Sequence, residues 1–154
     1  MKKIKATLRD IQDFLEPKKF AMVGVSRDPK KFGCQVFREL KNRGFTLFPV
    51  HHTAEKIDEL PACKTIADLP PDVKHLLIMT PKRETEKLVN DAIARGISHL
   101  WIQQMSDTPE AVQRAREAGI KLVTGQCIFM WAEPVRSIHK FHKSVYRLFG
   151  VLPK

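Results

Sequence analysis

The chain has 154 residues, the size of one domain. Apolar residues make up 43% of it, which is enough for a core that needs no disulfides or metals. Basic residues exceed acidic ones by 10 overall, yet residues 20–135 carry 16 basic and 14 acidic groups, so the main body is almost neutral. Because a nucleic-acid-binding surface usually has a basic stripe on its body, this distribution disfavours nucleic-acid binding as the main function.

The cysteines and the N-terminus bear on where the protein works. Cys34, Cys63 and Cys127 are far apart and form no Cys-x-x-Cys motif, which fits a reducing, cytoplasmic setting better than a disulfide framework or a zinc site. The N-terminus is charged where a secretory signal needs an apolar core, and no run of 18 apolar residues occurs. We therefore expect neither export nor a membrane span.

Short apolar runs alternate with amphipathic stretches along the chain. The runs predict buried strands over residues 20–25, 45–50, 74–79, 97–102 and 120–123. The amphipathic stretches predict helices over residues 33–42, after Thr80-Pro81, and from Thr108-Pro109 through Ala118. Because parallel strands need crossover connections, this alternation predicts an α/β fold, a Rossmann-like doubly wound parallel sheet of about five strands. Ligands bind such sheets beyond the carboxyl ends of the strands.

The segment between the first predicted strand and its helix carries the strongest functional signal. Gly24 and Gly33 allow a sharp turn and a close contact where the helix starts. The free N–H groups of a helix N-terminus suit a phosphate, and a hydroxyl and three cations stand nearby in the sequence. A solvated turn that is merely basic is the alternative. The predicted phosphate loop consists of Gly24, Val25, Ser26, Arg27, Lys30, Lys31, Phe32 and Gly33.

The type of phosphate ligand is narrowed by what the chain lacks. The dinucleotide fingerprint Gly-x-Gly-x-x-Gly is absent, because Ser26 stands in place of the second glycine. NAD-binding sheets also hold the ribose with an acidic residue after the second strand, where this chain has His51-His52 and no carboxylate before Glu55. Imidazoles suit an additional phosphate that a carboxylate would repel. The sequence therefore favours a ligand with a phosphate near its ribose over NAD.

Several separated motifs share a family pattern over about residues 15–133. They are Gly24-Val25-Ser26, Lys31-Phe32-Gly33, Phe48-Pro49-Val50, Asp68-Leu69-Pro70, Trp101-Ile102-Gln103, Ala118-Gly119-Ile120 and Cys127. Together they resemble the small bacterial CoA-binding proteins, whose Rossmann-type domain is similar to that of the succinyl-CoA synthetase alpha subunit. The resemblance implies that the loop after the first strand holds the phosphates of CoA. It further implies cofactor contacts at Val50, His51, Thr80, Pro81 and Gln103.

The chain departs from that family at three places. His51-His52 stand where Asn-Pro is usual, which removes the rigid turn of a proline and could alter affinity or ligand choice. Met105 stands where a glycine commonly follows the Trp-x-Gln element, and a glycine is also common near Glu59-Leu60.

No group of residues predicts catalysis or metal binding. Cys34 would lie in the first turn of a helix, where thiolates are favoured, but no histidine or acid in a nearby motif pairs with it. Adjacent side chains of an extended chain point to opposite sides, which disfavours a metal site at His51-His52. His139 and His142 share a predicted helix face without a third ligand. We expect no catalytic residue and no metal.

Residues 134–152 predict a basic amphipathic C-terminal helix. Its apolar stripe is formed by Ile138, Phe141, Val145, Leu148 and Leu152, and residues 136–154 carry five basic groups and no acidic one. Docking on the domain is the preferred interpretation. A subunit contact, as in a homodimer, and an acidic or membrane partner are the alternatives.

The sequence thus predicts a single domain, residues 1–154, with a core over residues 15–133. We expect it to bind coenzyme A or an acyl-CoA as a carrier, sensor or regulatory module without chemistry of its own. The first alternative is an oxidoreductase that uses NADP, and the second is a nucleic-acid-binding accessory protein that uses the basic chain ends.

Overall fold

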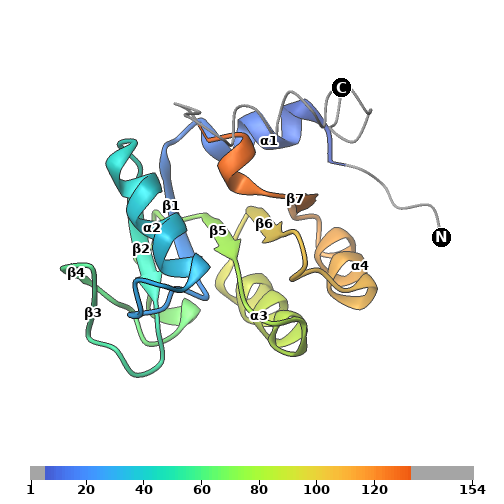
Figure 1. The fold of residues 1–154 in the computed structure, drawn as a ribbon. Helices are drawn as coiled ribbons and strands as arrows, with labels where there is room; N and C mark the ends of the chain where they lie inside the picture. Colours follow the sequence, from blue (N-terminus) through green and yellow to red (C-terminus); the bar gives the residue numbers. More distant parts are fainter. Residues whose placement is uncertain (1–5, 133–154) are drawn as a thin grey trace.

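The structure, a computed structural model, describes residues 6–132 (Figure 1). Its centre is a sheet of five parallel strands in the order β2-β1-β5-β6-β7. The predicted α/β fold with a Rossmann-like parallel sheet is confirmed. The predicted C-terminal helix over residues 134–152 lies outside the described residues. The strands of the sheet are β1 (Lys19–Val23), β2 (Thr46–Val50), β5 (His75–Ile78), β6 (His99–Gln103) and β7 (Lys121–Gln126).

Helices cover both faces of the sheet. Within residues 6–132 they are α1 (Leu8–Leu15), α2 (Phe32–Asn42), α3 (Lys82–Arg95) and α4 (Pro109–Glu117). One core cluster joins α1 and α2 to the sheet and the other joins α3 and α4 to it. Successive residues of β1 enter opposite clusters, Met22 the first and Val23 the second, because side chains alternate along a strand. None of the helices of this part of the chain is long and apolar enough to cross a membrane.

The predicted helix boundaries are close to those observed. Thr108 caps α4 as expected, and its hydroxyl accepts a hydrogen bond of 3.1 Å from the Ala111 N–H. Gly96, in the left-handed conformation at φ 77°, ends α3. Pro81 precedes α3 as its N-cap instead of forming its first residue.

Two parts of the fold were absent from the sequence prediction. Helix α1 begins with a capping box, in which the Thr7 hydroxyl accepts from the Asp10 N–H and the Asp10 carboxylate accepts from the Thr7 N–H. The Thr-x-x-Asp spacing was therefore a usable signal. A short hairpin, β3 (Lys56–Ile57) and β4 (Leu60–Pro61), turns through Asp58 and Glu59. Both turn residues have positive φ, 46° and 67°, which explains why glycine suits this place. Two 3₁₀ turns, Ile66–Asp68 and Ile128–Met130, complete the described elements.

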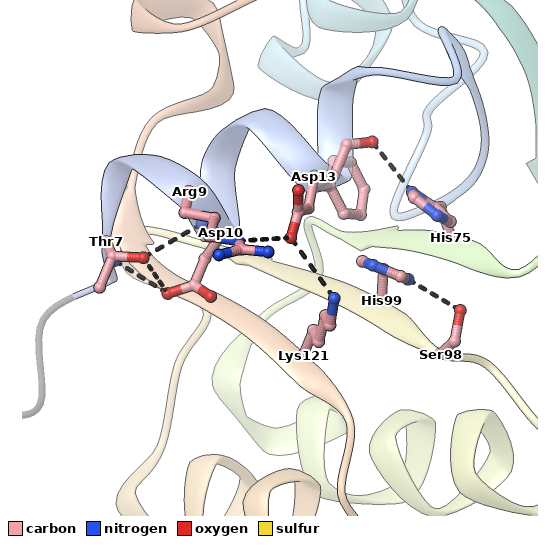
Figure 2. A network of polar contacts seen from close by, with 9 residues as sticks. Thr7, Arg9, Asp10, Asp13, His75, Ser98, His99 and Lys121 are labelled. Carbon is pink, nitrogen blue, oxygen red and sulfur yellow. Dashed lines mark hydrogen bonds and ion pairs between the residues drawn. The ribbon is translucent and has the colours of Figure 1, made fainter.

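Helix α1 lies against the edge of the sheet where β5, β6 and β7 begin (Figure 2). His75, His99 and Lys121 are the first residues of these strands and stand side by side in the register. The His75 Nδ1 lies 2.9 Å from the Phe14 carbonyl oxygen, and the Lys121 ammonium lies 3.4 Å from the Asp13 carboxylate. We call this end of the sheet, where β5, β6 and β7 begin and α1 packs, the amino edge. Polar pairs at this end of the sheet therefore join α1 to β5 and β7.

Candidate functional site

The strand order places the topological switch point of the sheet between β1 and β5. After β1 the chain moves outward to β2, and after β2 it returns across β1 to form β5 on the other side. Doubly wound sheets bind ligands at this point, outside the carboxyl ends of the strands. The loop from residue 24 to residue 33 follows β1 directly, so the predicted phosphate loop starts at the switch point.

Gly24 brings the ends of β1 and β5 together. Its φ is 96°, and a Cβ there would lie 2.5 Å from the carbonyl carbon and oxygen of Met79 and 3.0 Å from the Thr80 nitrogen. A side chain at this position would therefore collide with backbone and require a strained φ. The glycine allows the segment after β5 to lie directly against the first turn of the loop.

Gly33 likewise allows close backbone contact at the start of α2. A Cβ on it would lie 2.4 Å from the Gly24 carbonyl oxygen. The helix N-terminus is thus held against the end of β1 by backbone contact. The expected close contact at the helix start is present, and it joins two pieces of backbone. As a result, β1, β5 and α2 converge within van der Waals distance at the switch point.

The loop between the two glycines is shaped by its own hydrogen bonds. The Ser26 hydroxyl oxygen accepts from the Asp28 N–H at 3.0 Å. The Asp28 carboxylate accepts from the Lys30 N–H at 2.9 Å, and the Asp28 carbonyl accepts from the Lys31 N–H at 3.0 Å. The hydroxyl proton of Ser26 remains free to be donated. The role of Asp28 was not predicted from the sequence, although Ser-x-Asp-x-Lys is a spacing at which such side-chain turns form.

The N-terminus of α2 has the electrostatics of an anion site. Lys31 is its N-cap, no side chain caps the helix, and its first turn contains no acidic residue. The first N–H groups of a helix have no intrahelical acceptor, and the helix dipole adds partial positive charge. Three exposed cations, Arg27, Lys30 and Lys31, lie in the loop and form no ion pair within residues 6–132. The arrangement suits a phosphate or diphosphate group.

Thr80 supplies a buried hydroxyl beside Gly24. Thr80 is 6% exposed, and its Oγ1 has no hydrogen-bond partner in the described part of the chain. Buried hydroxyls are nearly always paired, so the Thr80 hydroxyl is available to a ligand at the switch point. A second unpaired hydroxyl, that of Thr124, lies in β7. An oxygen-rich anionic ligand would pair with the Thr80 hydroxyl, and the same ligand would suit the cations and N–H groups of the loop.

His51 follows β2 and is held as a neutral ring. Its Nδ1 accepts from the N–H groups of Thr53 and Ala54 at 3.2 and 2.9 Å. The proton of the neutral ring therefore lies on Nε2, which is left as a donor. Burial lowers the pKa of His51, and the charges of His52, Arg27 and Lys64 lower that pKa further.

The two adjacent histidines lie on the same side of the chain. The rings of His51 and His52 stack with centroids 5.1 Å apart and an interplanar angle of 4°. The expectation that they point to opposite sides was wrong, because the chain leaves the extended conformation after Val50 and turns. Within residues 6–132, no three histidine, cysteine, aspartate or glutamate side chains are grouped so that they could hold a metal ion.

The remaining predicted residues are divided between core and surface. Val25 and Val50 are buried in different core clusters, so only their backbone can face a ligand. Phe32 is 47% exposed, and its ring meets that of Phe129 edge-on at 5.7 Å. Gln103 is buried at the end of β6, where its Oε1 accepts from the Ile128 N–H at 3.1 Å. The contacts above bring Gly24, Gly33 and Thr80 together.

The three cysteines are free. Cys34 and Cys127 are buried, and the Cys63 thiol lies 3.7 Å from the Asp68 carbonyl oxygen. Burial, and then the Asp68 carboxylate, raise the pKa of Cys63. Burial of Cys34 and Cys127 and the raised pKa of Cys63 disfavour a reactive thiol at these positions.

Comparisons with known proteins identify the family and support the fold. The CoA binding domain family matches residues 18–132. The alpha subunit of acetate-CoA ligase (ADP-forming) II from Pyrococcus furiosus is 25% identical over 126 residues, which cover 75% of this chain and 28% of that subunit. Acetate-CoA ligase (ADP-forming) II from Archaeoglobus fulgidus is 32% identical over 98 residues, 62% of this chain and 15% of that protein. The chain therefore spans less than a third of the length of these curated relatives.

A solved structure of similar size has the same fold. The hypothetical protein from Pyrococcus horikoshii superimposes with a TM-score of 0.74 at 26% identity, and the match covers 83% of this chain and 94% of that one. All three of these organisms are archaea, so the shared feature is the CoA-binding domain and the expected bacterial grouping gains no support. Because the family match extends over well more than half of the sequence, this chain belongs to the CoA binding domain family.

Proposed function

We propose that the domain binds coenzyme A or an acyl-CoA and acts as a carrier, sensor or regulatory module without chemistry of its own. The observation that carries this proposal is the convergence at the switch point of the uncapped start of α2 and the unpartnered buried hydroxyl of Thr80. Membership of the CoA binding domain family supports the choice of ligand.

The diphosphate of CoA would lie on the loop after β1. The first N–H groups of α2 and the Ser26 hydroxyl would donate hydrogen bonds to its oxygens. Arg27, Lys30 and Lys31 would offset its charge, since none of them has an ion pair in the described residues. The shape of the loop is kept by its internal hydrogen bonds, so little ordering would be needed on binding.

The two arms of CoA would extend from this point in opposite directions. The adenosine arm would lie toward Val50 and His51 at the end of β2, where the Nε2–H of His51 is a donor for the phosphate on the ribose. The pantetheine arm would pass Thr80 and Pro81 at the end of β5, with Gln103 one strand further on.

The proposed role of the domain is binding alone. CoA, when bound, supplies a thiol or thioester, while the residues of this chain hold and orient it. Ligase activity is named for relatives several times longer than this chain, and no catalytic residue is proposed among residues 6–132. Three free cysteines favour the cytoplasm as the location.

The substitution Lys31→Glu tests the phosphate assignment. We expect CoA to bind about tenfold more weakly, equivalent to about 1.4 kcal/mol, as measured by isothermal titration calorimetry. The thermal midpoint should not fall, because an acidic side chain at a helix N-terminus interacts favourably with the dipole.

Lys74→Glu is the matched control. It makes the same change of charge at an exposed position just before β5, at the other end of the strands. CoA affinity in this variant should stay near that of the unmodified protein. Equal affinity in both variants would contradict the phosphate assignment, and binding of NADP without binding of CoA would favour the oxidoreductase alternative.

A further inference from the structure

Met105 occupies the third position of a tight turn that follows β6. The turn runs from Gln103 to Ser106, and the Ser106 N–H donates to the Gln103 carbonyl at 2.9 Å. Met105 has a φ of 72°. Turns with positive φ at the third position normally carry glycine there, because a side chain in the left-handed region is disfavoured.

The side chain of Met105 brings the fold no compensating burial. It is 78% exposed, and Phe32 is the other large apolar side chain that is exposed within residues 6–132. An apolar side chain that costs backbone strain and stays in water contributes nothing evident to folding. Such an outlier indicates a role outside the stability of the domain.

The turn that presents Met105 is fixed on both sides. The Gln104 N–H donates to the Gln126 carbonyl at 3.1 Å, which ties the turn to β7. The buried Thr85 hydroxyl donates to the Ser106 carbonyl at 2.7 Å, which ties it to α3. Met105 is therefore displayed at a defined place.

That place lies on the same edge of the sheet as the phosphate loop. The order β2-β1-β5-β6 puts the turn two strands from the end of β1, about 10 Å away at the usual spacing of strands. With the adenosine arm of CoA toward β2 and the diphosphate at β1, the pantetheine arm is directed across β5 toward β6. The far end of that arm, which carries the thiol or the acyl group, then arrives near Met105.

We infer that Met105 covers the acyl group of a bound short-chain acyl-CoA and makes the domain prefer an apolar thioester to free CoA. The inference rests on the proposed function. The methionine side chain is unbranched and polarizable, so it adapts to apolar groups of different shapes. Covering the acyl chain removes apolar surface of both partners from water, which favours the acylated ligand.

The test compares the affinities of butanoyl-CoA and CoA in the unmodified protein, in Met105→Gly and in Met105→Gln. We expect the unmodified protein to bind butanoyl-CoA about fourfold more tightly, the effect of burying roughly one methylene group. Both variants should lose this preference. Met105→Leu, the control, should keep most of it, because leucine is apolar and of similar size.

The readout is the ratio of the two dissociation constants, with the thermal midpoint of each variant recorded beside it. Glycine suits the turn, so Met105→Gly should melt no lower than the unmodified protein, and Met105→Gln keeps the test available if it does not fold. A ratio near one in the unmodified protein, or an unchanged ratio in both variants, overturns the inference while CoA binding stands. Failure of both ligands to bind overturns the proposed function and the inference together.

Discussion

The two edges of the sheet differ in how completely their polar groups are paired. At the amino edge, His75 meets the Phe14 carbonyl, and Asp13 meets Lys121 (Figure 2). At the opposite end, where the strands have their carboxyl ends, neither a partner for the Thr80 hydroxyl nor an ion pair of Arg27 is found within residues 6–132. The polar side chains named at the amino edge thus have partners within the protein, while a hydroxyl and a cation at the other end of the strands are available to a ligand.

This difference includes a free-energy cost at the carboxyl ends of the strands, although Lys18, just before β1, also has a positive φ of 50°. A buried polar group without a partner costs about 1–3 kcal/mol, and a side chain with positive φ about 1–2 kcal/mol. Both occur beyond the carboxyl ends of the strands, at Thr80 and Met105. Sites that bind ligands commonly sacrifice stability in this manner, because a ligand supplies the missing contacts.

The amino edge adds aromatic packing to its polar pairs. The Phe14 ring lies 5.1 Å from that of Phe20 and 5.4 Å from those of His75 and Trp101. The His75 and His99 rings stack at 4.1 Å. Aromatic pairs at these distances stabilise the fold beyond the area they bury. We therefore expect conditions that disturb the contacts of α1 at the amino edge to lower the free energy of unfolding.

The largest expected loss of stability comes from replacing Gly24 with alanine. Comparison with Gly44 separates the cost of its close packing from the cost of its positive φ. Gly24 and Gly44 have nearly equal φ, 96° and 93°, but a Cβ on Gly24 would lie 2.5 Å from Met79 backbone while one on Gly44 would meet nothing within 4 Å. Gly44→Ala should therefore cost about 1 kcal/mol, the strain alone. Gly24→Ala should cost several kcal/mol, about 3 or more, because backbone must also shift.

The measurement is urea-induced unfolding of the two variants beside the unmodified protein. Similar losses in both would mean that the ends of β1 and β5 are less tightly joined than their contact distance implies. A Gly24→Ala variant that stays folded should also bind CoA more weakly, whereas Gly44→Ala should not.

A smaller effect should appear when the amino edge is acidified. Burial lowers the pKa of His75 and His99, and the charges of His75 and Lys121 lower the pKa of His99 further. The hydrogen bond to the Phe14 carbonyl opposes the shift at His75, and Asp13 opposes it at both rings. The unfolded chain has a histidine pKa of about 6.5, so below this pH it takes up protons that the folded protein excludes. The free energy of unfolding should therefore be highest above about pH 6.5 and decrease as the pH falls below it.

Urea unfolding at pH 7.5 and pH 5.5 measures this decrease. The charged groups that act on the stacked rings from the packed elements are Asp13 of α1 and Lys121 of β7, and Arg9 pairs with Asp13. A variant with His75→Gln and His99→Gln should show a smaller loss between the two pH values. Some loss should remain, because the pKa of His51 is lowered as well. A double variant whose loss equals that of the unmodified protein would show that the amino edge is not sensitive to pH.

The sequence predicted the sheet well because its strands are buried on both faces. Continuous apolar runs such as residues 74–79 leave little choice of structure, and the glycines and prolines between them marked the turns. The loop after β1 could also be located from the sequence, because Gly24 and Gly33 stand at positions where backbone meets backbone. Its contact with phosphate stays a prediction.

What the sequence did not reveal depends on contacts between distant residues. The partner of the Gln103 side chain is Ile128, and that of the His75 ring is Phe14, 61 positions earlier in the chain. The stacking of His51 on His52 depends on a turn that His51 itself stabilises through the Thr53 and Ala54 N–H groups. Strand periodicity predicts none of these contacts, because each arises after the chain leaves regular structure or crosses to another element.

The smallest expected effect concerns the ion pair between Asp13 and Lys121. Their charged atoms lie 3.4 Å apart, but the Lys121 side chain is 56% exposed, so water and salt screen the attraction. A double-mutant cycle with Asp13→Asn and Lys121→Met should give a coupling of about 0.5 kcal/mol that decreases in high salt. A coupling well above 1 kcal/mol would assign the docking of α1 mainly to charge. The small value would leave it to Phe14 and the His75 hydrogen bond, which salt does not screen.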